Sequence, residues 1–101
     1  MSDALVELWH PDAGFARCGT DEEGAFSFVV RWMPYYETVV FARGLLKHVV
    51  TRMYLPGGDD QVLESLPEER RGTLAASPQD DGSLRFDIHL QGERETVFFA
   101  L

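Results

Sequence analysis

Basic residues are scarce in this sequence. Nine Lys and Arg stand against seventeen Asp and Glu, which gives a net charge of −8 at neutral pH. A protein that binds nucleic acid needs a basic face to neutralise phosphates, so this composition argues against a nucleic-acid partner. The chain also has no apolar run near the roughly 18 residues that a membrane span requires. We therefore expect neither a nucleic-acid nor a membrane partner.

Cysteine is represented once, by Cys18. A single cysteine cannot form an internal disulfide, and this fits a reducing compartment. The first residues, Met-Ser-Asp-Ala, carry neither the basic patch nor the apolar stretch of a secretion signal, so we expect a cytoplasmic location. No histidine stands near Cys18 in the sequence, which favours a packed strand residue over a catalytic thiolate.

The chain has no internal repeat, no low-complexity tract and no linker rich in Gly, Ser or Pro. A chain of 101 residues holds one hydrophobic core, so we expect a single domain over residues 1–101. The 45% of hydrophobic residues excludes disorder as the main state.

Short alternating segments separated by turn residues make up most of the chain, which is typical of an all-β sandwich. Pro67, followed by two glutamates, predicts one helical turn over residues 65–71. The sequence thus predicts an all-β fold, a two-sheet β-sandwich of about six to seven strands with one short helical turn. The predicted strands cover residues 4–9, 15–18, 25–30, 35–42, 47–54, 83–90 and 96–101.

Metal ligation has candidates but no ligand spacing. No two histidines form an H-x-H or H-x3-H pair, so a site would need the fold to bring distant residues together. Ferric iron prefers phenolate, imidazole and carboxylate donors. The alternative is that the tyrosines are ordinary strand residues, with one of the adjacent Tyr35 and Tyr36 facing the core and the other the rim. The candidate donors are His10, His48, His89, Tyr35, Tyr36, Tyr54 and Glu37.

Other catalytic patterns are missing from the sequence. The serines lack a G-x-S-x-G setting, and Gly57-Gly58 is not followed by the helix-opening pattern of a phosphate-binding loop. Adjacent carboxylates such as Asp59-Asp60 fall in loops, where we expect them to be solvated turn or cap residues. Residue types and spacing alone therefore predict only a small β-sandwich.

Two longer stretches are more specific. Residues 41–54 (FARGLLKHVVTRMY) and 85–99 (RFDIHLQGERETVFF) resemble segments of the intradiol ring-cleavage dioxygenases. Residues 4–9, 19–26 and 62–74 are similar to other parts of that family, and the chain looks like the alpha-type subunits of its protocatechuate-cleaving members. The resemblance implies a β-sandwich in an oligomer of alpha and beta subunits. It also implies Fe(III)-dependent opening of protocatechuate to 3-carboxy-cis,cis-muconate in aromatic catabolism.

The resemblance further implies that this chain does not hold the iron. In the family, two tyrosines and two histidines of the beta subunit bind the ferric ion. The H-x-H positions of catalytic relatives fall on Tyr35 and Glu37 here, and the segments that carry the iron tyrosines, after His10 and between Val30 and Pro34, are nearly absent. We expect no metal and no catalytic residue in this chain, and Fe(III) in a beta-subunit partner.

One family residue carries over. The resemblance implies that Arg43, in the F-A-R-G sequence, reaches the substrate pocket of the neighbouring beta subunit. A guanidinium suits that role because it pairs with a carboxylate through two hydrogen bonds and keeps its charge. The alternative is a bend residue that makes a surface ion pair.

Three hypotheses follow. The first is a non-catalytic alpha-type subunit that acts as a scaffold and pocket wall for an iron-bearing beta subunit. The second is a stand-alone, self-associating sandwich, because shortened loops leave sheet edges and apolar strand residues such as 39–41 exposed. The third is a metalloenzyme whose ligands come from the following set: His10, Tyr35, Tyr36, Glu37 and His48.

Overall fold

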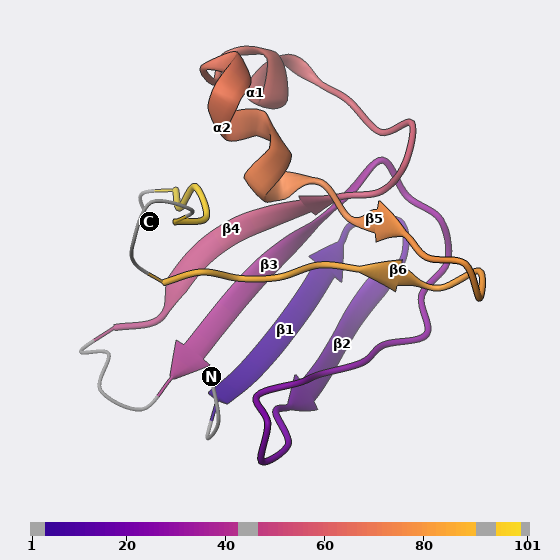
Figure 1. Cartoon of the computed structure of the whole chain (residues 1–101), viewed down its shortest axis with the longest axis vertical. Coiled ribbons are helices and arrows are strands. Elements are labelled where there is room, and N and C mark those ends of the chain that lie inside the picture. Colours follow the sequence, from indigo (N-terminus) through magenta and orange to yellow (C-terminus); the bar gives the residue numbers. More distant parts are fainter. Residues whose placement is uncertain (1–3, 43–46, 91–94, 100–101) are drawn as a thin grey trace.

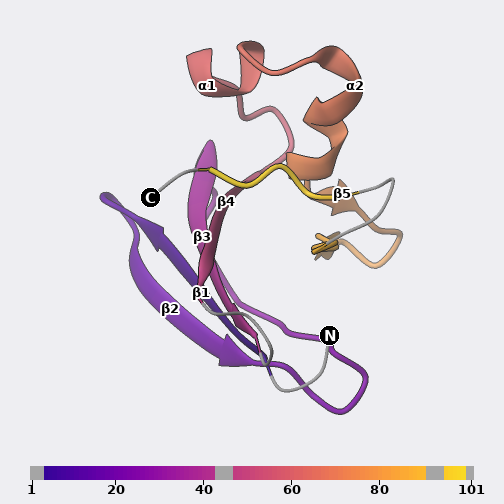
Figure 2. The same cartoon turned by 90° about the vertical axis from the view of Figure 1, so that its left-hand side faces the viewer.

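A computed structural model describes residues 4–42, 47–90 and 95–99. Its larger sheet is antiparallel, with the strand order β2-β1-β3-β4. A second layer, which includes the two-stranded sheet β5-β6, lies over one face of the larger sheet (Figures 1 and 2). This arrangement confirms the predicted all-β sandwich. The strands are β1 (Ala4–His10), β2 (Gly14–Gly19), β3 (Tyr35–Ala42), β4 (Val49–Tyr54), β5 (Ser77–Pro78) and β6 (Leu84–Arg85).

Antiparallel pairing sorts the side chains of the larger sheet onto two faces, since directly opposite residues point the same way. We call the face toward the second layer the inner face and the opposite one the outer face. On the inner face, Val6 lies opposite Val40 and Tyr36 opposite Met53. These side chains are buried, whereas the alternate positions of β3 are only partly buried or exposed. The inner face is therefore the floor of the core.

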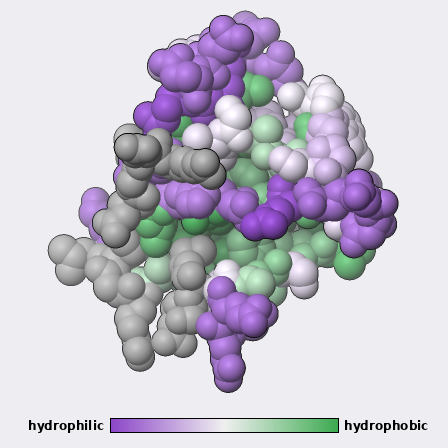
Figure 3. All heavy atoms as spheres, in the orientation of Figure 1, coloured by the Kyte–Doolittle hydropathy of each residue, from purple (hydrophilic) through white to green (hydrophobic). Residues whose placement is uncertain are grey.

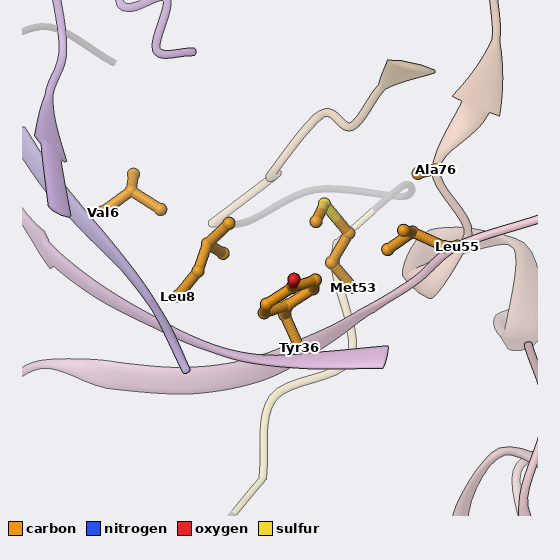
Figure 4. Close-up of a cluster of buried hydrophobic side chains, with 6 residues drawn as sticks. All are labelled: Val6, Leu8, Tyr36, Met53, Leu55 and Ala76. Atoms are coloured by element: carbon orange, nitrogen blue, oxygen red, sulfur yellow. The ribbon is translucent and has the colours of Figure 1, made fainter. Parts of the chain in front are cut away.

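The core lies between this inner face and the second layer. Apolar side chains from the second layer pack on the sheet, and the hydroxyl of the buried Tyr36 donates a hydrogen bond of 2.7 Å to the backbone oxygen of Arg31. That bond satisfies the one polar atom that Tyr36 brings into the core. The buried cluster contains Val6, Leu8, Tyr36, Met53, Leu55 and Ala76 (Figure 4), and Phe26, Phe28, Val30, Met33 and Phe86 pack against it.

The second layer contains fewer paired residues than the sequence predicts. Residues 25–30 keep the alternating burial of a strand but form no ladder with the described residues, and only Leu84–Arg85 of the predicted strand 83–90 is paired. The physical reason is distance, because a groove of about 1060 Å³ lies between these two segments. Figure 3 shows hydrophobic surface on both sides of the hydrophilic band formed around residues 84–90. Of the predicted strand 96–101, the described part forms one bridge, between Val50 and Phe99.

The structure has three short helical turns where the sequence predicts one over residues 65–71, and only α2 lies within that range. These are α1 (Gln61–Glu64), α2 (Glu68–Arg71) and the 3-10 turn η1 (Gly72–Leu74). The carboxylate of Asp60 accepts a hydrogen bond of 3.0 Å from the Leu63 backbone N–H and caps α1, as expected for a helix start. Among the described residues, no helix has the length and apolar character needed to cross a bilayer.

Replacing a core side chain tests this assignment of faces. We expect Leu8→Ala to lower the free energy of unfolding by about 2–5 kcal/mol, because Leu8 is 1% exposed and its removal leaves a cavity. The matched control is Leu84→Ala, where the side chain is 42% exposed and the loss should stay below about 1 kcal/mol. Urea unfolding followed by circular dichroism measures both. Equal losses would show that the inner face is not the core.

Candidate functional site

The most densely connected polar side chains lie at one end of the larger sheet. Tyr35 and Glu37 of β3 stand directly opposite Tyr54 and Arg52 of β4, so all four share the outer face. Asp60, at the start of α1, reaches the same place. We call these five residues the Arg52 cluster.

A tight turn after β4 brings Asp60 to the cluster. Gly57 has a φ of +82°, which favours glycine, and the Gly58 N–H donates a hydrogen bond of 2.8 Å to the Leu55 oxygen. A Cβ on Gly58 would clash with the backbone oxygen of Pro34. The two glycines therefore let the chain reverse close to the start of β3.

The guanidinium of Arg52 is the centre of the cluster. It donates hydrogen bonds to Glu37 at 3.0 Å, to Asp60 at 2.9 Å and to the Tyr54 oxygen at 3.3 Å. The Tyr54 hydroxyl in turn donates to Asp60 at 2.7 Å. The Arg52 guanidinium carbon also lies 4.3 Å from the centre of the Tyr35 ring, which is a cation–π contact.

The charges of the cluster stabilise one another. Burial by itself raises the pKa of Asp60, but the Leu63 N–H, the Tyr54 hydroxyl and the Arg52 charge outweigh it and hold that pKa below its usual range. Burial alone would lower the pKa of Arg52, yet its bond to Tyr54 and the charge of Glu37 leave it raised. Burial raises the pKa of Tyr54 to about 12. The cluster thus holds an ionised Asp60, a charged Arg52 and a neutral Tyr54.

Arg52 engages both Tyr35 and Glu37, the positions that the resemblance matches to the family's iron histidines. Tyr35 and Glu37 do point to the same side of β3, as two metal ligands on a strand would. However, the ring of Tyr35 lies under the guanidinium and the carboxylate of Glu37 is ion-paired with it at 3.0 Å. A permanent cation in contact with both residues opposes a second cation between them. As arranged here, these residues do not fit a ferric ion.

The five donors of the metalloenzyme hypothesis do not converge. Tyr36 points into the core, whereas the His48 ring lies 5.1 Å from that of Phe41, at the opposite end of β3. At about 3.3 Å per strand residue, Tyr36 and Phe41 are roughly 16 Å apart. Within the part of the chain that the structure describes, no three His, Cys, Asp or Glu residues are grouped to hold a metal ion.

His10 is buried at the end of β1 and closes the turn into β2. Its Nδ1 accepts a hydrogen bond of 3.0 Å from the Asp12 N–H, and its oxygen accepts one of 3.1 Å from the Ala13 N–H. Its ring contacts those of Tyr35 and Tyr36 edge-on, at 5.2 and 6.1 Å. A turn of three residues, 11–13, joins β1 to β2.

The other candidates are scattered. Cys18 is half-buried in β2, consistent with a packed strand residue, and His89 is exposed in the second layer. Arg43 lies outside the described residues. Sequence reasoning predicted that Asp60 caps a helix or lies in a turn, but it missed Arg52 as the centre of a cluster. The available signal was alternation, which placed Arg52 on the face away from Thr51 and Met53.

Comparisons with known proteins point to one family. The chain is 37% identical over 135 aligned positions to a protein of Burkholderia cepacia named protocatechuate 3,4-dioxygenase alpha chain, and this match covers 98% of the chain and 68% of that relative. A Pseudomonas putida protein of the same name is 37% identical over 78 positions, covering 65% of the chain and 37% of the relative. No protein-family model matches the chain.

The first alignment is longer than the chain itself. With 135 aligned positions against 101 residues, the Burkholderia cepacia relative has at least 34 residues in this region without a counterpart here. The chain is therefore shortened internally relative to that protein.

Alkaline pH tests the state of Tyr54. The pKa of Tyr54 is about 12 in the folded chain but near 10 in the unfolded chain. The stability that this difference contributes is therefore fully present below pH 10 and is lost as the pH rises toward 12. We expect the free energy of unfolding of Tyr54→Phe to fall less over this interval than that of the wild type. Urea unfolding at a series of pH values measures the slope. The control is Tyr35→Phe, which keeps the ring that contacts Arg52 and should show the wild-type slope. A wild-type slope in Tyr54→Phe would contradict the raised pKa of Tyr54.

Proposed function

Because the chain belongs to the family of protocatechuate 3,4-dioxygenase alpha chains, we propose that it is a non-catalytic alpha-type subunit. In this role it supports an iron-bearing beta subunit that cleaves protocatechuate to 3-carboxy-cis,cis-muconate with Fe(III) and oxygen. The chain contributes a sandwich scaffold and part of the wall of the substrate pocket. The ferric ion and its ligands belong to the beta subunit.

The contact of Arg52 with both Tyr35 and Glu37 carries this proposal. A catalytic subunit needs those two positions as neutral metal ligands. Here a phenol ring and a carboxylate surround a guanidinium instead, and Asp60 fixes the guanidinium from a third side at 2.9 Å. The cluster uses its donors to stabilise the fold, which supports a structural subunit.

Arg43 is the residue we propose as this chain's contribution to the pocket. In the sequence it follows directly on Ala42, the last residue of β3. A guanidinium at the rim of the beta subunit's pocket would pair with the substrate carboxylate and orient the ring, without taking part in the oxygen chemistry.

A stand-alone, self-associating sandwich is the second candidate. The observation that favours it is the exposure of large apolar side chains on the larger sheet, with Trp9 at 46% and Phe15 at 56%. Such side chains would be covered if two copies associated. This candidate requires no beta subunit and no iron.

Co-expression with an iron-bearing protocatechuate 3,4-dioxygenase beta chain tests the proposal. We expect the two chains to elute together, the iron to follow the beta chain, and the turnover per iron atom to be higher in the complex than in the beta chain alone. The isolated chain should be colourless and inactive. A preparation of this chain alone that binds iron and opens protocatechuate would refute the proposal, as would a beta chain whose activity is unaffected by its presence.

Replacing Arg43 in the assembled enzyme tests its role at the pocket. We expect Arg43→Gln to raise the KM for protocatechuate by about 10-fold or more, because a charge-assisted hydrogen bond to the substrate carboxylate is lost. The effect on kcat should be smaller. The control is Lys47→Gln, which removes an exposed positive charge near the same segment and should leave KM unchanged. Identical KM values for the two variants would exclude Arg43 from the pocket.

A further inference from the structure

The outer face of the larger sheet is apolar where a sheet exposed to water is normally polar. Trp9, Phe15 and Phe41 are 46%, 56% and 38% exposed, and Trp9 and Phe15 are direct cross-strand partners. Their exposure is unusual because antiparallel sheets with one solvated face normally place polar residues there. The apolar and aromatic side chains that alternation assigns to this face around Trp9, Phe15 and Phe41 are Leu5, Tyr35, Val39 and Val50.

The charged residues of the outer face are paired within the face. Glu7 forms an ion pair with Arg17 at 3.0 Å, and Glu37 forms one with Arg52 at 3.0 Å. Arg17 also lies over the Phe15 ring, 5.5 Å from its centre. The charges of these four strand residues cancel. Aromatic side chains, arginine and few unpaired charges are the features of the buried centre of a protein–protein interface.

None of the described elements covers the part of this face that β1 and β2 form, whereas the segment before α1 covers the other end, where Asp60 bonds the 2% exposed Tyr54. Figure 2 shows the second layer and α2 on the other side of the larger sheet, with β1 and β2 open toward the left of the view. The core cluster confirms that Phe26, Phe28 and Phe86 pack on the inner face. Within the described residues, the outer face therefore meets solvent around Trp9, Phe15 and Phe41.

The border of the face is acidic at the end that holds the Arg52 cluster. Asp12 lies exposed in the turn after β1, Asp59 is exposed after β4, and Glu64 is exposed in α1. Two arginines lie beside them, since Arg31 donates a hydrogen bond to the backbone oxygen of Asp12 and Arg71 donates one to that of Glu64. These carboxylates therefore exceed the neighbouring guanidinium groups by one. Because the charges of Glu7, Arg17, Glu37 and Arg52 cancel, the chain's net charge of −8 comes from residues other than these four. A second copy would repeat the small excess of carboxylates at this border across the interface, whereas a surface with basic residues around an apolar centre would complement it.

We propose that the outer face is the docking surface for a different polypeptide, which presents an apolar surface bordered by basic side chains. This inference rests on the proposed function, since it identifies where the chain receives its beta-type subunit. Trp9, Phe15 and Phe41 are the anchors that the partner covers, and the ion pairs Glu7–Arg17 and Glu37–Arg52 are buried with them.

Substitution of exposed anchors tests the surface without disturbing the core. The variants are Phe15→Ser, Phe41→Ser and the double variant, and the probe is an iron-bearing protocatechuate 3,4-dioxygenase beta chain whose binding is measured by calorimetry. We expect each single variant to raise the Kd at least about 10-fold and the double variant to raise it further, as for anchors near an interface centre. Binding by the wild type should weaken with rising salt, because the acidic border pairs with basic residues.

The matched control is Val29→Ser, which removes an apolar side chain that is fully exposed in the second layer. It should bind the beta chain like the wild type, and all variants should keep the wild-type circular dichroism spectrum and urea midpoint. If the wild type binds the beta chain and Phe15→Ser and Phe41→Ser bind it equally well, the docking surface is overturned while the proposed function stands. Salt-independent binding would contradict the basic border.

Two outcomes concern the identity of the occupant. A wild-type chain that does not bind the beta chain at all overturns both the proposed function and this inference. The isolated wild-type chain could instead form a dimer by light scattering that Phe15→Ser converts to a monomer. If the beta chain also fails to compete with that dimer, the face serves self-association, and the choice of a different polypeptide is overturned.

Discussion

The positive charge of Arg52 connects three parts of the structure that are distant along the chain. It reaches Glu37 across the β3–β4 ladder and Asp60 after the turn, and Asp60 caps α1. The Arg52 side chain is 19% exposed and both carboxylate side chains are 29% exposed, so water weakens each attraction but does not remove it. Losing one carboxylate would leave the guanidinium with unsatisfied donors, and the sheet would lose its connection to the helical segment.

This arrangement shows how two side chains of one strand can share an orientation while both are engaged within the protein. Two side chains on alternate positions of one strand point the same way whether or not they bind metal. In this chain those positions, Tyr35 and Glu37, surround an internal cation that is part of the protein. The same end of the sheet is closed by the three-residue turn after His10.

Much of the larger sheet could be predicted from local patterns. Residues 35–42 were predicted as a strand and are β3, and Tyr36 faces the core while Tyr35 faces outward, as the alternation implies. The segment 25–30 has the same alternation, yet it pairs with no other described strand. A paired strand needs a neighbouring strand within hydrogen-bonding distance, and local alternation does not specify that distance. The Arg52–Asp60 contact was missed for a related reason, since it depends on the exact reversal at Gly57 and Gly58. The family was predicted from longer stretches, where many residues agree at once.

The groove between the two segments of the second layer has a consequence for how the molecule opens. Backbone groups of residues 26–30 and 86–88 have no ladder partner among the described residues, whereas β3 is bonded on both sides. Local opening requires little energy where few backbone bonds must break. The amide hydrogens of these two segments therefore exchange with solvent through small fluctuations, while those of β3 exchange only when the whole sheet comes apart.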